Sequence, residues 1–300
     1  MKFAFVLAEK AYFPVTVLCK CMGGSPSGFY EWLERPPSTR QREDAKLLEK
    51  LADTHAKHKR RYGSRRHRAD LLESEMISVG RNRVRRLMKA GNLHARQRRP
   101  YKVTTKSDHE HPVADNHLDR KFQPALPNQA WVGDITYLPT SEGWLYLAVV
   151  IDLYSRRVGG WAMSTLATRQ LVLDALQMAL GRREVGPGLL LFHSDRGVQY
   201  ASRDFRKALQ KRQITPSMSR RGNCWDNAVA ESFFASLETE LLDEMKGASR
   251  ETVGQAVFDY IERYYNRQRL HSTLGYKTPA AIEAQAINRR CARPEGVQAA

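Results

Sequence analysis

Three carboxylates in the second half of the chain stand where acidic side chains are uncommon. Asp134 falls inside a run of strand-forming residues, and Asp195 directly follows an apolar run, at the edge of a sheet where ligands usually bind. Glu231 lies early in an amphipathic stretch, at the border of its apolar face. Carboxylate oxygens suit Mg²⁺ or Mn²⁺, and three of them gathered without a cation would repel one another. These residues are therefore candidate metal ligands.

Other titratable residues near these positions have competing interpretations. His193 is the last residue of a buried strand. It either acts at the site, by orienting a metal ligand or as a base, or is a packed, hydrogen-bonded residue, and the two interpretations are equally favoured. Asp152 lies inside an apolar strand, where burial near the site is possible. Asp226 fits a helix N-cap and Glu240 a solvated helix face better than a chemical role.

The elements that would position the three acids follow from the hydrophobic pattern. Three short segments, rich in β-branched, aromatic and aliphatic residues and joined by turns, predict adjacent strands at residues 131–138, 145–153 and 156–164. Beyond them, strands at residues 189–192 and 214–218 alternate with helical stripes. A meander that leads into strand–helix units predicts an α/β domain, a mixed sheet with helices on both faces.

The first 99 residues instead follow a helical period throughout. A short helix ends at Gly23, and Pro26 opens the next one, which predicts an all-α, helix-turn-helix-type region. Basic residues crowd the non-apolar positions of the later helices, and either form a solvated face or contact DNA phosphates. The candidates for DNA contact are Arg65, Arg66, Arg81, Arg83, Arg85 and Arg86. Residues 100–127 read as a proline-containing linker, and residues 268–300 as a C-terminal extension that ends in a loose tail.

Charge and composition narrow the class of protein. The net charge is +17, of which residues 1–125 contribute +13 and the remainder +4, so the favoured partner is a polyanion, with nucleic acid first. An apolar run long enough to span a membrane and a secretory signal are both absent from the sequence. Four scattered cysteines do not form a disulfide framework or a zinc-finger spacing, which favours a reducing compartment.

Three motifs carry a resemblance to a known family. They are Trp131-Val-Gly-Asp134-Ile-Thr, His193-Ser-Asp195-Arg-Gly-Val-Gln-Tyr200 and Asp226-Asn-Ala-Val-Ala-Glu231-Ser-Phe-Phe. In this order, with 35 residues between Asp195 and Glu231, they resemble the DDE transposases of bacterial insertion sequences, of the second-frame (OrfB) type with a retroviral-integrase-like core. The resemblance extends through Arg61-Tyr-Gly-Ser-Arg-Arg and His271-Ser-Thr-Leu-Gly-Tyr276 and covers nearly the whole chain.

The resemblance implies an RNase H-like fold for residues 128–267 and metal-dependent DNA cleavage followed by strand transfer. Asp134, Asp195 and Glu231 would be the catalytic residues and the ligands of two Mg²⁺ (or Mn²⁺) ions. The partners would be double-stranded DNA, at the element ends and the target, and further copies of the chain on paired ends. A fusion with an upstream-frame product and a bacterial cytoplasmic, nucleoid-associated location are also implied.

One position departs from the family pattern. Glu238, seven residues after Glu231 and on the same helix face, stands where many relatives carry a basic residue that touches the terminal nucleotides. An acid there would repel phosphate, and Arg220 and Arg221, in the approach to this helix, are the alternative DNA contacts. Two other functional classes compete with a transposase: a simple RNase H-type nuclease without strand joining, and a DNA-binding regulator.

Overall fold

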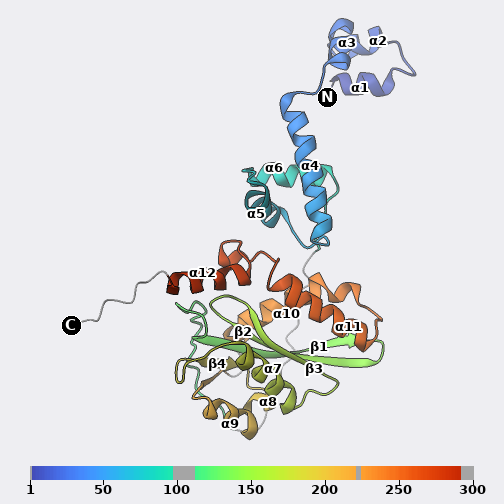
Figure 1. The fold of residues 1–300 in the computed structure, drawn as a ribbon. Helices are drawn as coiled ribbons and strands as arrows, with labels where there is room; N and C mark the ends of the chain where they lie inside the picture. Colours follow the sequence, from blue (N-terminus) through green and yellow to red (C-terminus); the bar gives the residue numbers. More distant parts are fainter. Residues whose placement is uncertain (1, 97–111, 221–223, 292–300) are drawn as a thin grey trace, which may run out of the picture. The chain divides into compact units, whose positions relative to one another are not determined.

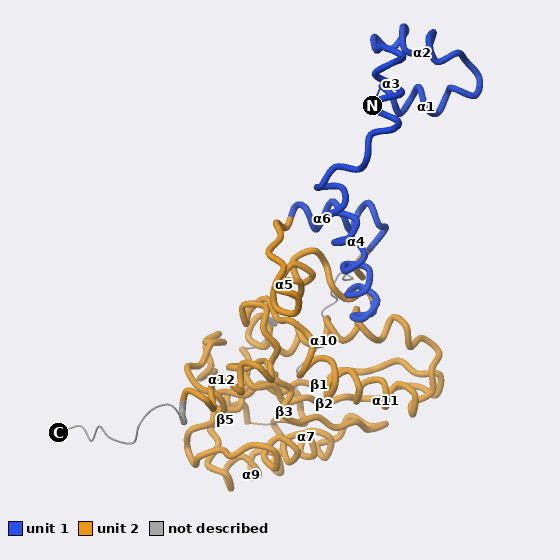
Figure 2. Tube along the Cα trace, turned by 45° about the horizontal axis from the view of Figure 1, so that its top comes forward, with its two compact units in different colours: residues 1–59, 82–93 blue, residues 60–81, 94–300 orange. Residues whose placement is uncertain are grey.

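The computed structural model describes residues 2–96, 112–220 and 224–291. The chain forms two compact units: residues 1–59 with 82–93, and residues 60–81 with 94–300 (Figure 2). This division does not follow the predicted boundaries at residues 99 and 127, because residues 60–81 group with the sheet. The functions assigned to the predicted segments remain predictions. In the described residues, no helix combines the length and apolar character needed to cross a membrane.

The first unit is entirely helical. Its helices are α1 (Lys2–Glu9), α2 (Val15–Cys21), α3 (Pro26–Glu34), α4 (Thr39–Lys57) and α6 (Arg81–Ala90). The first three share a small core of Val6, Leu18, Cys19 and Phe29. Ser38 and Gln41 form a capping box that starts α4, each side chain accepting from the other residue's backbone N–H. The predicted all-α region is therefore confirmed.

A five-stranded mixed sheet organises the second unit. Its strands are β1 (Ala130–Thr140), β2 (Gly143–Asp152), β3 (Val158–Ser164), β4 (Leu191–Ser194) and β5 (Thr215–Met218). The spatial order is β3-β2-β1-β4-β5: the first three strands pair antiparallel, and β4 runs parallel to both β1 and β5. The hydrophobic pattern predicted all five strands, and the mixed sheet is confirmed.

Helices cover both faces of this sheet (Figure 1). One face packs against α7 (Arg169–Arg182), α8 (Val198–Ala201) and α9 (Arg203–Lys211), and the other against α10 (Ala228–Glu240), α11 (Arg250–Phe258) and the π-helix Asp259–Tyr265. Side chains alternate along a strand, so Trp131 joins the α7 core and Val132 the α10 core. By the same alternation Asp134 lies on the α10 side of β1.

Gly133 lets the sheet close tightly beside Asp134. A Cβ atom at this position would lie 2.5 Å from Cζ of Phe192 and 3.3 Å from a ring carbon of Tyr200. Real side chains do not tolerate the first of these distances, so only glycine fits here without movement of Phe192. The residue before Asp134 is thus dictated by the packing of β4 and α8.

The remaining elements surround the sheet domain. They are α5 (Ser64–Glu75), α12 (Pro279–Cys291) and short 3₁₀ helices at Cys224–Asn227, Leu242–Glu244 and Ser272–Leu274. The hydrophobic pattern did not predict α12, whose Glu283 forms ion pairs with Arg157 and Arg183. The predicted C-terminal extension therefore contains a helix, and residues 292–300 lie outside the described residues. In the predicted linker, the described residues 112–127 lack regular structure, yet Leu118 is buried in the core.

Candidate active site

Three elements bring the predicted acids to one end of the sheet. Asp134 lies on β1, and Asp195 follows the last residue of β4. Since β1 and β4 are parallel neighbours with Gly133 opposite Ser194, Asp134 and Asp195 occupy adjacent positions at the same edge. Glu231 lies in the first turn of α10, which packs on the face of β1 that carries Asp134.

Burial and neighbouring acids both act on Asp134. Burial raises the pKa of Asp134 well above its ordinary value, and the nearby carboxylates of Asp195 and Glu231 raise it further. The backbone N–H of Ile135, which donates to Asp134 Oδ1 at 2.8 Å, opposes this shift only in part. Burial also raises the pKa of Glu231. The buried phenol of Tyr200 has a raised pKa because of its burial and because Asp134 and Asp195 are near.

This donor set fits a hard divalent cation, although it is not a closed cage. In residues 2–96, 112–220 and 224–291, no three His, Cys, Asp or Glu side chains are arranged to enclose a metal ion. The three acids nonetheless supply only oxygen donors, the type that Mg²⁺ and Mn²⁺ prefer. Their mutual repulsion, expressed in the raised pKa of Asp134, is the charge imbalance that a bound cation would relieve.

We expect Asp134→Asn to stabilise the metal-free protein. A carboxyl whose folded pKa is raised lowers stability as the pH rises above its unfolded value of 3.8, so at pH 7 the Asp134 carboxyl opposes folding. Asparagine removes that charge, and a gain of roughly 2–6 °C in Tm is expected in the presence of a chelator. The gain should shrink as the pH is lowered toward 4. Calorimetry of both proteins across this pH range measures it.

Asp174→Asn is the matched control for that experiment. Asp174 is exposed on α7 and accepts a hydrogen bond from Gln170, so its replacement should change Tm by less than about 2 °C. An Asp134→Asn protein that melts at or below the wild-type temperature at pH 7 would show that the Asp134 carboxylate is not strained.

Backbone groups orient the Asp195 carboxylate. Gly197 N–H donates to Asp195 Oδ1 at 2.9 Å, and the Ser194 hydroxyl donates to the Asp195 carbonyl at 2.9 Å. Gly197 also begins α8, so the turn that follows β4 and the position of the carboxylate are built by the same residues. The turn that follows β4 therefore supplies one of the contacts that orient this carboxylate.

Asn227 is a site residue that the sequence analysis missed. It is buried directly before α10, four residues ahead of Glu231, and its amide donates to the carbonyl of Gly133 at 3.4 Å. Its Oδ1 atom is buried without a hydrogen-bond partner in the described structure. The four-residue spacing before Glu231, which places both residues on one side of a helix, is the feature that would have identified it.

His193 is held by two serines. Its Nδ1 lies 2.9 Å from the Ser217 hydroxyl and its Nε2 lies 3.2 Å from the Ser219 hydroxyl. Burial lowers the pKa of His193 to about 4, so the ring is neutral at physiological pH. Both ring nitrogens therefore contact β5 and the residue that follows it, and neither of these hydrogen bonds reaches the three acids.

The three rival carboxylates all serve buried structural networks. Asp152 ends β2, accepts from the indole N–H of Trp131 and pairs with Arg183 at 3.1 Å. The N-cap prediction for Asp226 is wrong: this fully buried carboxylate binds Arg220 and Arg120, and their contacts lower its pKa. The prediction of a solvated Glu240 is also wrong, because this side chain is buried against Arg269. In each case a distant basic residue supplies the compensating charge.

Several of the predicted DNA-contacting arginines are exposed, and several form ion pairs. The exposed side chains are those of Arg65, Arg81, Arg85, Arg86 and Arg220. Engaged side chains are those of Arg83 and Arg86, which pair with Asp44; Arg66, which pairs with Glu240; and Arg220, which pairs with Asp226. Arg221 lies outside the described residues. Glu238 is exposed on α10.

A helix with several exposed basic residues was not identified from the sequence. In α9, Phe205 and Leu209 are buried, whereas the exposed positions carry Arg203, Arg206, Lys207 and Lys211 beside the acidic Asp204, which pairs with Arg169. The basic residues recur at helical spacing opposite the apolar ones, and this pattern was available in the sequence. The face follows Asp195 closely in the chain and is suited to phosphate contact.

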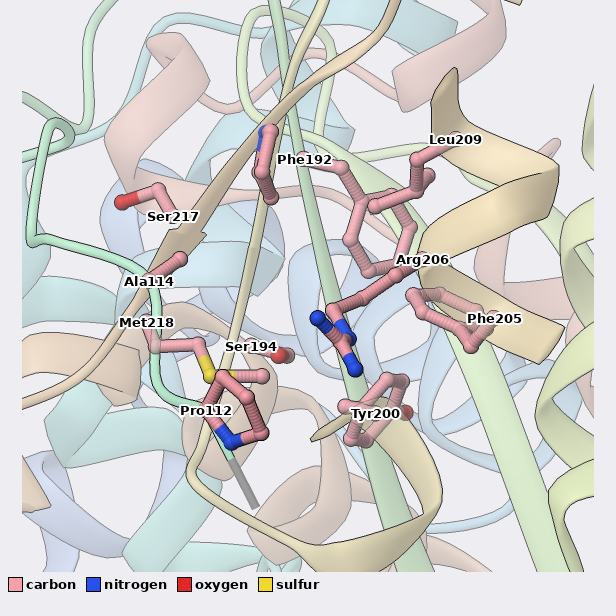
Figure 3. A pocket seen from close by; sticks show the side chains of 11 residues that line it. Pro112, Ala114, Phe192, Ser194, Tyr200, Phe205, Arg206, Leu209, Ser217 and Met218 are labelled. Atoms are coloured by element: carbon pink, nitrogen blue, oxygen red, sulfur yellow. The ribbon is translucent and has the colours of Figure 1, made fainter. Parts of the chain in front are cut away.

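The cavity beside β4 is too small for a substrate. It measures about 30 Å³, close to the volume of one water molecule. Figure 3 shows the guanidinium of Arg206 and the ring of Tyr200 on one side, with Pro112 and Met218 on the other. A ligand as large as DNA would therefore use the surface of this unit and not this cavity.

Comparisons with known proteins define the class of this protein. Residues 124–224 and 212–279 each match the family described as "Integrase core domain", and residues 41–101 match the "HTH-like domain". The mixed sheet with its acids and the helical region agree with both matches. The protein is thus an integrase-core protein with an HTH-like, DNA-binding domain.

Sequence relatives identify the family. The chain is 42% identical over 265 residues to the "Insertion element IS600 uncharacterized 31 kDa protein" of Shigella sonnei, covering 88% of this chain and 97% of that protein. It is 41% identical over 285 residues to the "Transposase InsF for insertion sequence IS3A" of Escherichia coli (strain K12), covering 94% and 98%. The chain belongs to the IS3 family of insertion-sequence transposases, and the resemblance seen in its motifs is confirmed.

Solved structures with lower similarity include two viral proteins. One belongs to the simian T-cell lymphotropic virus intasome in complex with the PP2A regulatory subunit B56 gamma: 17% identity, TM-score 0.45, 83% of this chain and 78% of that chain. The other is the HTLV-2 integrase catalytic core domain in complex with magnesium: 18% identity, TM-score 0.42, 54% of this chain and 99% of that chain.

Proposed function

We propose that this transposase cuts DNA at the ends of its insertion sequence and joins the cut ends to new DNA in a metal-dependent reaction. Asp134, Asp195 and Glu231 are its catalytic residues and hold the metal ions, two Mg²⁺ (or Mn²⁺) being expected. The observation that carries the proposal is the gathering of these carboxylates at one sheet edge, where burial and like charge raise the pKa of Asp134.

The chemistry follows from the charge that develops at phosphorus. Two divalent ions bound at this edge would activate water and stabilise negative charge on the entering and leaving oxygens. In the first step water attacks phosphorus, and the 3′-oxygen of the cut strand leaves as a free 3′-OH. In the second step this 3′-OH attacks the phosphorus of another phosphodiester, and the 3′-oxygen of that attacked phosphodiester leaves. Each step exchanges the bonds at one phosphorus atom directly, without a covalent protein intermediate. The backbone N–H groups of Ile135 and Gly197 keep Asp134 and Asp195 oriented throughout.

Phosphate contacts are assigned to basic side chains that the protein leaves exposed. Arg65, Arg81 and Arg85 serve the HTH-like region, and α9, which follows Asp195 in the chain, contributes its exposed basic residues. Arg83, Arg86 and Arg220 contribute only with donors that remain after their ion pairs. Two element ends must be held together, so we expect a homo-oligomer on DNA, with an upstream-frame fusion product as a further partner.

Strand transfer on a labelled duplex tests the proposal. The duplex carries the terminal repeat that flanks the coding sequence, and the full chain is assayed in Mg²⁺, with and without a chelator, alone and as the upstream-frame fusion. Joined products that require the metal support the proposal. Cleavage without joining in both forms would indicate a simple nuclease, and binding without cleavage would indicate a regulator.

A further inference from the structure

The end of α10 carries a buried carboxylate. Glu240, nine residues after Glu231 on the same helix, is 5% exposed. The Arg269 guanidinium donates to both of its oxygens, with Nε at 2.8 Å from Oε2 and Nη2 at 2.7 Å from Oε1. The hydroxyl of Tyr260 donates to Oε2 at 2.9 Å. The carboxylate is therefore bound on two sides by the segments that follow α11.

Two further segments meet at the same residue. Arg61 Nε donates to the carbonyl of Glu240 at 3.0 Å, and Arg96 Nη1 donates to that carbonyl at 2.9 Å. Arg66 Nη1 approaches the side-chain Oε1 at 3.4 Å. Arg96 N–H also donates to the Arg60 carbonyl at 3.0 Å, which joins the two segments to each other. Glu240 is thus the common partner of residues 60–66 and of Arg96.

Aromatic residues secure the first of these segments. The fully buried Tyr62 hydroxyl donates to the Gln268 carbonyl and accepts from Leu270 N–H, both at 3.0 Å. The Arg61 guanidinium lies 4.2 Å from the centre of the Tyr264 ring, a cation–π contact in a buried setting. All these contacts lie within the second unit.

The position of these segments in the chain gives the cluster its meaning. Residues 60–81 precede, and residues 94–96 follow, the stretch 82–93, which belongs to the helical first unit. That stretch contains most of α6 with Arg83, Arg85 and Arg86. The chain therefore enters the second unit at residue 60 and enters it again at residue 94, and close to both entry points it is fixed to the last residue of α10.

We propose that Glu240 is a positioning residue that fastens to the catalytic helix α10 both segments by which the chain enters the second unit from the first, so that cleavage depends on correct binding of the element end. This inference rests on the proposed function of Glu231 in the first turn of the same helix. A helix moves as a rigid element, so a displacement of either segment at Glu240 is transmitted along α10 to Glu231. The proposal also gives Arg66 a role in coupling instead of phosphate contact.

A pair of neighbouring arginines tests it. Arg65 is exposed, whereas Arg66 binds Glu240, so Arg65→Gln and Arg66→Gln remove the same charge from adjacent positions with different contacts. For Arg66→Gln we expect end-duplex affinity to stay within about twofold, and end-specific cleavage to fall by roughly 3- to 30-fold. Random nicking of plasmid DNA in Mn²⁺ should be unchanged. Arg65→Gln should instead weaken end binding and reduce its salt dependence by about one phosphate contact.

Outcomes that overturn the proposal are distinct from a failure of the proposed function. If Arg66→Gln loses end affinity and salt dependence as Arg65→Gln does, Arg66 is a phosphate contact and the coupling is refuted. If specific cleavage and random nicking fall equally, Arg66 is merely structural. Tyr62→Phe, which deletes the hydroxyl bonded to Gln268 and Leu270, serves as a second variant. It too should lower end-specific cleavage while end affinity and random nicking stay unchanged. Nicking that persists in Glu231→Gln would refute the proposed active site and leave the coupling test intact.

Discussion

Replacing Glu231 with glutamine is expected to abolish cleavage and joining while the protein stays folded. The side chain keeps its shape but loses the charge needed to hold a divalent cation, which removes several kcal/mol of transition-state stabilisation, equivalent to about a 10³-fold or larger loss of rate. Stability should hold or rise, because burial raises the pKa of Glu231 and its charge is unfavourable in the fold. Product formation on the end duplex and Tm measure the two effects together.

Glu238→Gln is the matched control for this variant. Glu238 lies seven residues further along α10 and is exposed, so its loss leaves the acids at the sheet edge untouched. Cleavage should remain within about threefold of wild type, and DNA affinity should rise slightly because a like charge is removed from the phosphate surface. A Glu231→Gln protein as active as this control would refute the assignment of Glu231 as a metal ligand.

The second large effect is expected from Glu240→Gln, on stability. Removing one partner of a buried ion pair costs about 3–5 kcal/mol, because Arg269, itself only 4% exposed, is left without its carboxylate. For a chain of this size the loss corresponds to a fall of roughly 10 °C in Tm. Calorimetry at pH 7 measures the change.

The pH dependence of stability distinguishes this cause from lost packing. Burial alone would raise the pKa of Glu240, but Arg269 and Arg66 hold it below its ordinary value of 4.5. Its contribution is therefore complete above pH 4.5 and is lost as the pH falls through the lower folded pKa. The difference in Tm between the variant and wild type should accordingly narrow in acid.

Glu244→Gln supplies the comparison at a solvent-exposed pair. Glu244 is about half exposed and binds Arg96, so its replacement should cost no more than about 1 kcal/mol. Equal losses from Glu240→Gln and Glu244→Gln would contradict a dominant role for the buried carboxylate.

Local patterns in the sequence were sufficient to predict the strands of the sheet and the positions of the three acids on its elements. The β-branched, aromatic and aliphatic residues of β1 and β2, and the apolar run before Asp195, are properties of neighbouring residues, so they could be read before any folding was known. The placement of Asp134 within a strand and of Asp195 after one already implied a common edge. The motifs around them were enough to indicate the family, which the relatives of the chain confirmed.

The roles of the charged residues could not be read in the same way. Arg66 and Glu240 lie 174 residues apart, and Arg120 and Asp226 lie 106 apart, so no window of sequence contains both partners. A helical pattern reports which face is apolar, but it does not report which charges another segment will cover. For this reason the sequence predicted a solvated Glu240, and it did not indicate that Arg66 pairs with this residue.

The folded chain also selected among residues of the same type. Arg65 and Arg66 are indistinguishable by composition and spacing, yet one is exposed and the other is bound to a buried carboxylate. The difference arises because a buried charge is tolerated only with a partner, and the partner comes from whichever segment the tertiary fold brings near. Short sequence motifs thus indicated the family and its chemistry, whereas the tertiary structure determined which charged residues pair with each other.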